Sequence, residues 1–91
     1  MNPLDAHLDT RRKRLRFRSW HRGTREIDLL LGTFADRYLS ELSESELDSY
    51  EALLLEGDPD LFEWISGKVA PPAHQDTTVL RLLIRTQLFP L

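Results

Sequence analysis

Apolar residues recur at helical spacing between residues 24 and 40, and this pattern constrains the fold more than any other in the sequence. Its members are Ile27, Leu30, Leu31, Phe34 and Tyr38, with Leu29 and Leu39 widening the stripe. Side chains three or four residues apart share one face of an α-helix, and an apolar face packs against other apolar surface. The sequence therefore predicts a central core helix over about residues 24–40. Gly32 within it lowers helix stability by about 1 kcal/mol relative to alanine, which a close crossing of a second helix would explain.

Two further helices are marked by residues at their ends. Ser43 and Glu46 have the spacing of a capping box, in which each side chain bonds the backbone of the other, so a helix should start after Ser43. Gly57 suits the position that follows the end of this helix. Asp58 then suits the N-cap of a short fourth helix, and Gly67 should end it.

The first and last helices have weaker boundaries. The first is expected to begin at Asp9 or Thr10, after residues 1–8, which we expect to be frayed. The last should cover about residues 76–88 and leave residues 89–91 as a tail. There is no Asn-Gly or Asp-Gly turn and no sustained alternation of apolar and polar residues, as paired strands would require. The whole chain of 91 residues is therefore predicted to be one all-α domain, a small bundle of about five helices.

The composition excludes several kinds of chemistry. Without cysteine, the chain forms no disulfide, thiolate nucleophile or cysteine-ligated metal site. The three histidines, His7, His21 and His74, lack the spacing of metal ligands, and no serine, histidine and acid stand together as in a hydrolase. No apolar run reaches the roughly 20 residues that span a bilayer, and the first residues lack the apolar core of a secretory signal. We therefore expect a cytoplasmic protein that is not an enzyme, binds no metal and does not insert into a membrane.

The charges divide unequally along the chain, although the net charge is only −3. Residues 1–25 hold eight Lys and Arg against two acids, a balance of +6, whereas residues 26–91 hold four against thirteen, a balance of −9. A basic stripe along the first helix would be formed by Arg11, Arg14, Arg18 and Arg22. With Phe17 and Trp20 beside it, the stripe could follow a phosphate backbone, so a small nucleic-acid-binding regulator is the alternative function. The acidic residues in the rest of the chain argue against nucleic acid as the partner. The arginines and Trp20 favour a protein partner, since Arg and Trp are enriched at protein-binding hot spots.

The segment Arg22-Gly23-Thr24-Arg25-Glu26 stands where the basic region meets the central helix. If the helix runs through it, Arg22 and Glu26 lie four residues apart on one face. Gly23 between them would leave no side chain in the way of an approaching surface. Alternatively, Gly23 is only the N-cap of the helix, with Glu26 reaching back to close a capping box. The spacing alone leaves both interpretations open.

Two motifs together resemble a known family. Arg22-Gly23-x-x-Glu26, followed by Asp58-Pro59-Asp60-Leu61-Phe62-x-Trp64, resembles the succinate dehydrogenase assembly factors, small flavinylation factors with an R-G-x-x-E motif. The resemblance covers roughly residues 11–85, and the chain looks like a bacterial member because it lacks the N-terminal extension of a mitochondrial one. It implies a chaperone that binds the flavoprotein subunit of succinate dehydrogenase, or in some bacteria of fumarate reductase. The family promotes covalent attachment of FAD to a histidine of that subunit, so this chain itself is expected to hold no cofactor.

The resemblance also implies which residues meet the client flavoprotein. Arg22, Gly23 and Glu26 match the motif and are expected on the client-facing surface. We extend that surface, as a hypothesis, to the neighbours Trp20, His21, Arg25 and Asp28. The Asp58-Pro59-Asp60-Leu61-Phe62-x-Trp64 segment is expected to cap a helix and brace this surface from within. No catalytic residue is expected on this chain, no nucleic acid is expected as a partner, and the free protein is expected to be a monomer.

Overall fold

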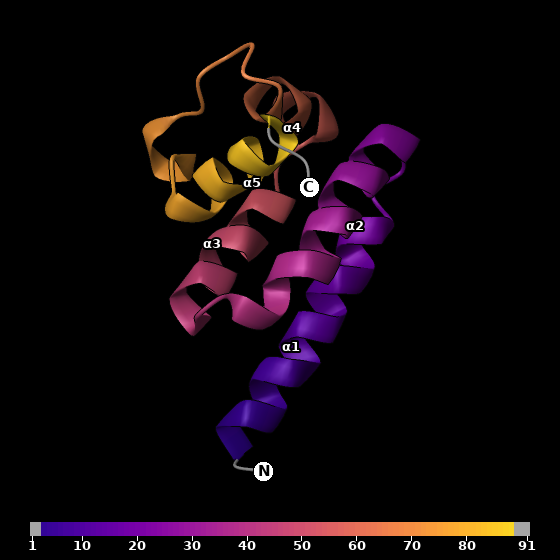
Figure 1. The fold of residues 1–91 in the computed structure, drawn as a ribbon, viewed down its shortest axis with the longest axis vertical. Coiled ribbons are helices and arrows are strands. Elements are labelled where there is room, and N and C mark those ends of the chain that lie inside the picture. The colour runs from indigo at the N-terminus through magenta and orange to yellow at the C-terminus, as the bar shows by residue number, and fades with distance from the viewer. Residues whose placement is uncertain (1–2, 89–91) are drawn as a thin grey trace.

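The computed structural model describes the backbone of residues 3–88 and the side chains of residues 5–87. Within that range the chain forms five α-helices and two short 3₁₀ helices and has no strand, which confirms the predicted all-α bundle. In chain order the elements are α1 (Pro3–Trp20), α2 (Arg25–Tyr38), η1 (Leu39–Glu41), α3 (Glu44–Leu54), α4 (Asp58–Ile65), η2 (Ala73–Gln75) and α5 (Thr78–Leu88). Helices α1 and α2 lie side by side and antiparallel, while α3, α4 and α5 gather against one side of this pair (Figure 1).

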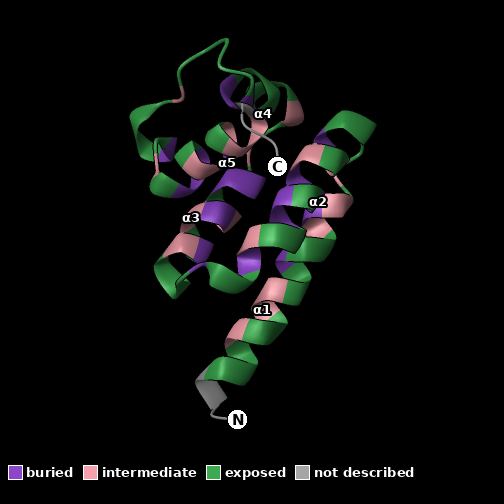
Figure 2. Ribbon diagram, viewed as in Figure 1, coloured by how far each residue is buried: buried purple, intermediate pink, exposed green. Residues whose placement is uncertain are grey.

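Each of the five α-helices contributes a fully buried leucine to one core. These residues are Leu15, Leu31, Leu47, Leu61 and Leu83, each with no measurable exposure. Burying one leucine side chain stabilises a fold by roughly 1.5–3 kcal/mol, so the five together hold every helix to the same centre. Figure 2 shows the buried positions facing the middle of the bundle and the exposed positions facing outward.

Helices α1 and α2 cross closely at Gly32, as the position of this glycine in the central helix predicted. A Cβ atom added at Gly32 would overlap the indole ring of Trp20. The Trp20 indole nitrogen also donates a hydrogen bond to Asp36 Oδ1 at 3.2 Å. The glycine therefore gives up helix propensity so that an aromatic ring of α1 can lie against the backbone of α2.

A small polar network lies inside the apolar core. The Ser19 hydroxyl donates to the Leu15 carbonyl at 2.7 Å, and its oxygen lies 2.6 Å from the Tyr50 hydroxyl. Tyr50 also reaches the Leu31 carbonyl at 3.4 Å, so the network joins α1, α2 and α3. Because burial disfavours the phenolate, the pKa of Tyr50 is raised to about 12.

The predicted capping box of α3 is confirmed. The Ser43 backbone N–H donates to Glu46 Oε1 at 2.8 Å, and the Glu46 N–H donates to Ser43 Oγ at 3.2 Å. Gly67 follows α4 with a φ of 81°, and its N–H bonds the Trp64 carbonyl at 3.2 Å. Its left-handed backbone explains why glycine ends this helix, as predicted.

Three other predicted boundaries are wrong. Helix α1 begins at Pro3 rather than at Asp9 or Thr10, because proline is well tolerated in the first turn of a helix. Helix α3 ends at Leu54, and Gly57 is the N-cap of α4 with a φ of −72°, an ordinary extended conformation. Asp58 is consequently the first residue of α4 and not its N-cap.

The start of α5 lies close to its predicted position. Helix α5 begins at Thr78, two residues later than expected, and the Thr77 hydroxyl accepts a hydrogen bond from the Leu80 N–H at 3.2 Å. A threonine that bonds the first turn in this way satisfies an N–H group that has no partner within the helix. The predicted tail, residues 89–91, lies outside the described residues, as do the first two residues of the segment expected to be frayed.

Candidate partner-binding site

A four-residue turn, residues 21–24, connects α1 to α2 and contains the glycine of the motif. Gly23 has a φ of 118°, a backbone conformation that residues with a side chain adopt only under strain. It is exposed, and no described atom lies within 4 Å of the position a Cβ would take. The glycine is therefore required by the turn and also leaves a bare patch of backbone at the surface.

The beginning of α2 contradicts both sequence interpretations of the motif. Helix α2 starts at Arg25, so Arg22 lies outside it and does not share a helical face with Glu26. The N-cap is Thr24, not Gly23, and it makes no side-chain cap. Instead, Asp28 Oδ1 accepts hydrogen bonds from the N–H groups of Arg22 at 2.6 Å and Gly23 at 3.3 Å. This carboxylate therefore satisfies backbone N–H groups just before the helix and fixes the shape of the turn.

The guanidinium group of Arg22 is bound within the chain. Its Nε donates to Asp58 Oδ1 at 3.0 Å, and its two terminal nitrogens donate to the carbonyls of Leu54 and, at 2.6 Å, Glu56. The side chains of Arg22 and Asp58 are only 14% and 19% exposed. Three directed donors on a planar fork hold the α1–α2 turn against the α3–α4 turn. We call this arrangement the Arg22–Asp58 clamp.

The other charged end of the motif faces outward. The Glu26 side chain is exposed, and its carboxylate makes no hydrogen bond or ion pair with any described residue. Arg25 beside it is also exposed. The His21 ring stacks on Phe17 with a centroid separation of 4.0 Å and bonds the Phe17 carbonyl through Nδ1 at 2.6 Å. An exposed surface around the turn is thus built from an acid, a base, a bare glycine and a stacked aromatic pair.

The predicted site residues therefore separate into two groups. Trp20, Arg22 and Asp28 are partly buried and occupied by contacts within the chain. Exposed at the surface are His21, Gly23, Arg25 and Glu26. The structure brings all seven to one end of the α1–α2 pair, but only the second group is open to another molecule.

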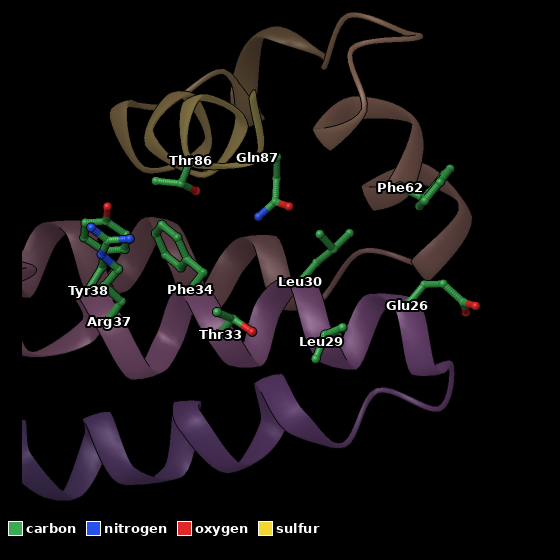
Figure 3. A pocket seen from close by; sticks show the side chains of 10 residues that line it. All are labelled: Glu26, Leu29, Leu30, Thr33, Phe34, Arg37, Tyr38, Phe62, Thr86 and Gln87. Atoms are coloured by element: carbon green, nitrogen blue, oxygen red, sulfur yellow. The ribbon is translucent and has the colours of Figure 1, made fainter. Parts of the chain in front are cut away.

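Sequence reasoning missed a groove on the outer face of α2. It has a volume of about 450 Å³ and lies between α2, Phe62 of α4 and the end of α5 (Figure 3). We call it the α2–α5 groove, lined by Glu26, Leu29, Leu30, Thr33, Phe34, Arg37, Tyr38, Phe62, Thr86 and Gln87. Leu29, assigned to the core stripe from the sequence, is 59% exposed, and Phe62 is 40% exposed. The sequence did contain a sign of this groove. Helix α2 has more apolar residues than one helix face can bury, so some of them had to remain exposed.

The basic stripe on α1 is largely neutralised by ion pairs. Arg11 lies 2.6 Å from Asp48 and 3.1 Å from Glu51, and Arg18 lies 3.4 Å from Glu51. Hydrogen bonding to Asp48 raises the pKa of Arg11 above its usual value. With Arg22 held by Asp58, three of the four arginines pair with acids of α3 and α4. The stripe therefore joins helices within the bundle, which weakens the case for nucleic-acid binding.

The described residues offer little else for chemistry. Residues 5–87 contain no group of three or more His, Asp and Glu side chains arranged as metal ligands. Among the helices between residues 3 and 88, none combines the length and the apolar character needed to cross a bilayer. What the site can do is present a fixed shape and a few charges to another molecule.

The sequence is similar to members of one known protein family. A family model described as the flavinator of succinate dehydrogenase matches residues 13–87. The mitochondrial succinate dehydrogenase assembly factor 2 of Dictyostelium discoideum is 42% identical over 78 residues, covering 86% of this chain and 55% of that protein. The FAD assembly factor SdhE of Acetobacter pasteurianus is 37% identical over 80 residues, covering 88% of this chain and 73% of that protein.

A third relative has a similar sequence identity and covers a similar share of the chain. The mitochondrial succinate dehydrogenase assembly factor 2 of Debaryomyces hansenii is 41% identical over 80 residues, covering 84% of this chain and 56% of that protein. The chain thus spans little more than half the length of the mitochondrial relatives described here. The resemblance inferred from the two sequence motifs is confirmed. The chain belongs to the family of succinate dehydrogenase flavinators.

Proposed function

We propose that this protein is an assembly factor that binds the flavoprotein subunit of succinate dehydrogenase and promotes covalent attachment of FAD to it. The family match over residues 13–87 supports the class of function. The binding site is inferred from the different surroundings of two motif residues. Glu26 is exposed and has no described partner, whereas Arg22 is held by Asp58. A carboxylate without a described partner, held in the first turn of α2 beside a fixed connecting turn, is suited to pair with a cation of the client.

The protein acts by positioning. FAD attachment requires the 8α carbon of the flavin to be held against a histidine of the client, and correct placement alone lowers such a barrier substantially. The clamp and the Asp28 hydrogen bonds fix the turn before the client arrives, so little conformational entropy is lost on docking. Gly23 lets the client backbone approach closely. No reactive group of this chain takes part, and the flavin stays on the client.

The decisive experiment co-expresses the flavoprotein subunit with the wild type or with Glu26→Ala. Covalent flavin is read from the fluorescence of the denatured client in a gel, and binding is measured by calorimetry. Glu26→Ala should lose most of both while keeping wild-type helicity. The matched control is Glu41→Ala, another exposed glutamate, placed in η1 and outside the motif. Normal flavinylation with Glu26→Ala would contradict the proposal.

Several finer points belong to the same proposal. The client includes the fumarate reductase flavoprotein where the host has one, the free protein is a monomer, it acts in the cytoplasm and it carries no flavin of its own. Pull-down from the native host with mass spectrometry identifies the clients. Sedimentation of the purified protein gives its mass in solution, and its visible spectrum reveals any bound flavin. A flavin spectrum in the purified protein would replace the positioning role with direct cofactor transfer.

A further inference from the structure

We propose that the α2–α5 groove is a second contact for the client, and that it receives an apolar segment with a basic residue at one end and an acidic residue at the other. This inference rests on the proposed function, because it extends the same docking surface. Glu26 belongs both to the motif and to the groove, so a client seated on the turn already reaches the groove's edge.

The groove exposes apolar side chains that the bundle does not cover. Leu29 and Phe62 are 59% and 40% exposed at its edges, Leu30 and Tyr38 are half-buried, and Phe34 is buried beneath. Figure 3 shows Leu30 and Phe34 of α2 directed toward α5, with Phe62 near Glu26, at the end of the groove opposite Arg37. A hollow, apolar surface rimmed by polar residues is typical of a protein-binding site.

The charges at the two ends of the groove have opposite signs. Glu26 lies at one end, where a neighbouring hollow of about 460 Å³ adds Glu63, while the Asp58 carboxylate of that hollow is already paired with Arg22. Arg37 lies at the other end, with its guanidinium carbon 5.3 Å from the centroid of the Tyr38 ring. Glu26 and Arg37 are eleven positions apart in the sequence, which is about 16 Å along a helix. An occupant of that length is therefore oriented by charge, with its base toward Glu26 and its acid toward Arg37.

The occupant is a convex segment of a different protein surface rather than a second copy of the same groove. Two identical hollows facing each other would leave unfilled space, and protein interfaces are packed as densely as protein interiors. The client supplies the complementary surface because it is already held at the turn beside Glu26. Contact along the groove would also fix the orientation of the client, which one contact at a turn cannot do alone.

The test compares two exposed leucines. Leu29→Gln removes an apolar contact from the groove, whereas Leu55→Gln is a matched control because Leu55 is 75% exposed and lies outside the groove. Calorimetry with the recombinant flavoprotein subunit should show an affinity about tenfold lower for Leu29→Gln, the loss expected for one buried leucine side chain. Leu55→Gln should bind as the wild type does. Equal losses in both variants would overturn the proposal.

A second pair of variants tests the charge at the far end. Arg37→Glu should lower affinity by about fivefold at low salt, with a smaller effect as salt screens the interaction. The control is Arg14→Glu, an exposed arginine of α1 that makes no ion pair with a described residue. Wild-type affinity for Arg37→Glu would contradict the proposed orientation of the occupant.

The remaining outcomes separate this inference from the function on which it rests. If Glu26→Ala loses client binding while Leu29→Gln keeps it, the groove proposal fails and the proposed function stands. If the wild type binds no flavoprotein, both fail. If Leu29→Gln leaves client affinity unchanged, the client does not occupy the groove. In that case, a change of the protein from dimer to monomer in this variant would show that a second copy occupies the groove. A lower melting temperature would show that residues of the same chain occupy it.

Discussion

The two charged residues that define the motif have opposite surroundings. Arg22 is 14% exposed and donates to one carboxylate and two carbonyls of its own chain, whereas Glu26 is exposed without a described partner. Although they are four residues apart in sequence, Arg22 is bound within the fold and Glu26 is open to another molecule. A short motif can therefore combine a residue that is bound within the fold with one that, as we propose, binds a partner, and only the three-dimensional contacts tell the two apart.

The largest effect on stability is expected from Arg22→Ala. This change leaves the largely buried Asp58 carboxylate without its ion pair, so the free energy of unfolding should fall by about 3 kcal/mol. For a domain of this size that corresponds to a melting temperature roughly 10–25 °C lower. Urea unfolding followed by circular dichroism measures the loss. Arg22→Lys should recover little of it, because a lysine does not provide the planar fork. Wild-type stability in Arg22→Ala would remove the distinction between the two ends of the motif.

A smaller effect, of about 2–3 kcal/mol, should appear at alkaline pH through the buried network. The pKa of Tyr50 is about 12 in the folded protein against about 10 in the unfolded chain. Above pH 10 the unfolded state gives up a proton that the folded state keeps, so this contribution is fully present below pH 10 and is lost as the pH rises toward 12. Urea unfolding at pH 9 and pH 11 measures about half of this loss, roughly 1.4 kcal/mol, because the interval extends only one pH unit above the pKa of the unfolded chain. Tyr50→Phe should flatten this part of the profile, and an equally steep loss in that variant would assign it to other groups.

Gly23→Ala should cost about 1–2 kcal/mol. The residue has a φ of 118°, so the penalty comes from backbone strain and not from a clash, since no described atom lies within 4 Å of an added Cβ. The effect on client affinity should exceed the effect on stability, because the new methyl group would stand on the proposed docking surface. Thermal unfolding and calorimetry on the same sample compare the two. Gly57→Ala serves as the control for backbone strain, because Gly57 has an ordinary negative φ and an added Cβ would make only van der Waals contact, so any loss there reflects the poorer N-cap of α4.

The smallest effect on stability is expected from Glu26→Ala. Its carboxylate contributes only a weak interaction with the positive end of α2, so the free energy of unfolding should change by about 0.5 kcal/mol or less. The same variant is expected to lose client binding. A stability loss as large as that of Arg22→Ala would show that Glu26 also supports the fold, and the comparison would then fail.

Much of the fold could be predicted because it depends on local sequence. The period of apolar residues along α2 predicted its core face, and Ser43 with Glu46 predicted the start of α3, since both signals lie within a few residues of each other. Gly57 was misassigned because glycine suits both the end of one helix and the N-cap of the next. Proline at position 3 was overlooked as a helix start.

The candidate site was less predictable, because its main contacts are distant in sequence. Arg22 and Asp58 are 36 residues apart, and nothing in either local pattern indicates that they meet. Both belong to the motifs that carried the family resemblance, which gives no sign of this contact, and the expectation that Arg22 faces the client stays a prediction. Leu29 and Phe62 were assigned to the core because a sequence pattern distinguishes apolar from polar positions but does not show which apolar positions remain uncovered.

The Arg22–Asp58 clamp has a consequence for genetics. A screen that scores only whether a host respires on succinate would place substitutions at Arg22, Asp58 and Glu26 in one class, as though all three touched the enzyme. Those at Arg22 and Asp58 should be temperature-sensitive and relieved by second-site changes that strengthen the core. Those at Glu26 should be insensitive to temperature and relieved only by a compensating change in the partner gene.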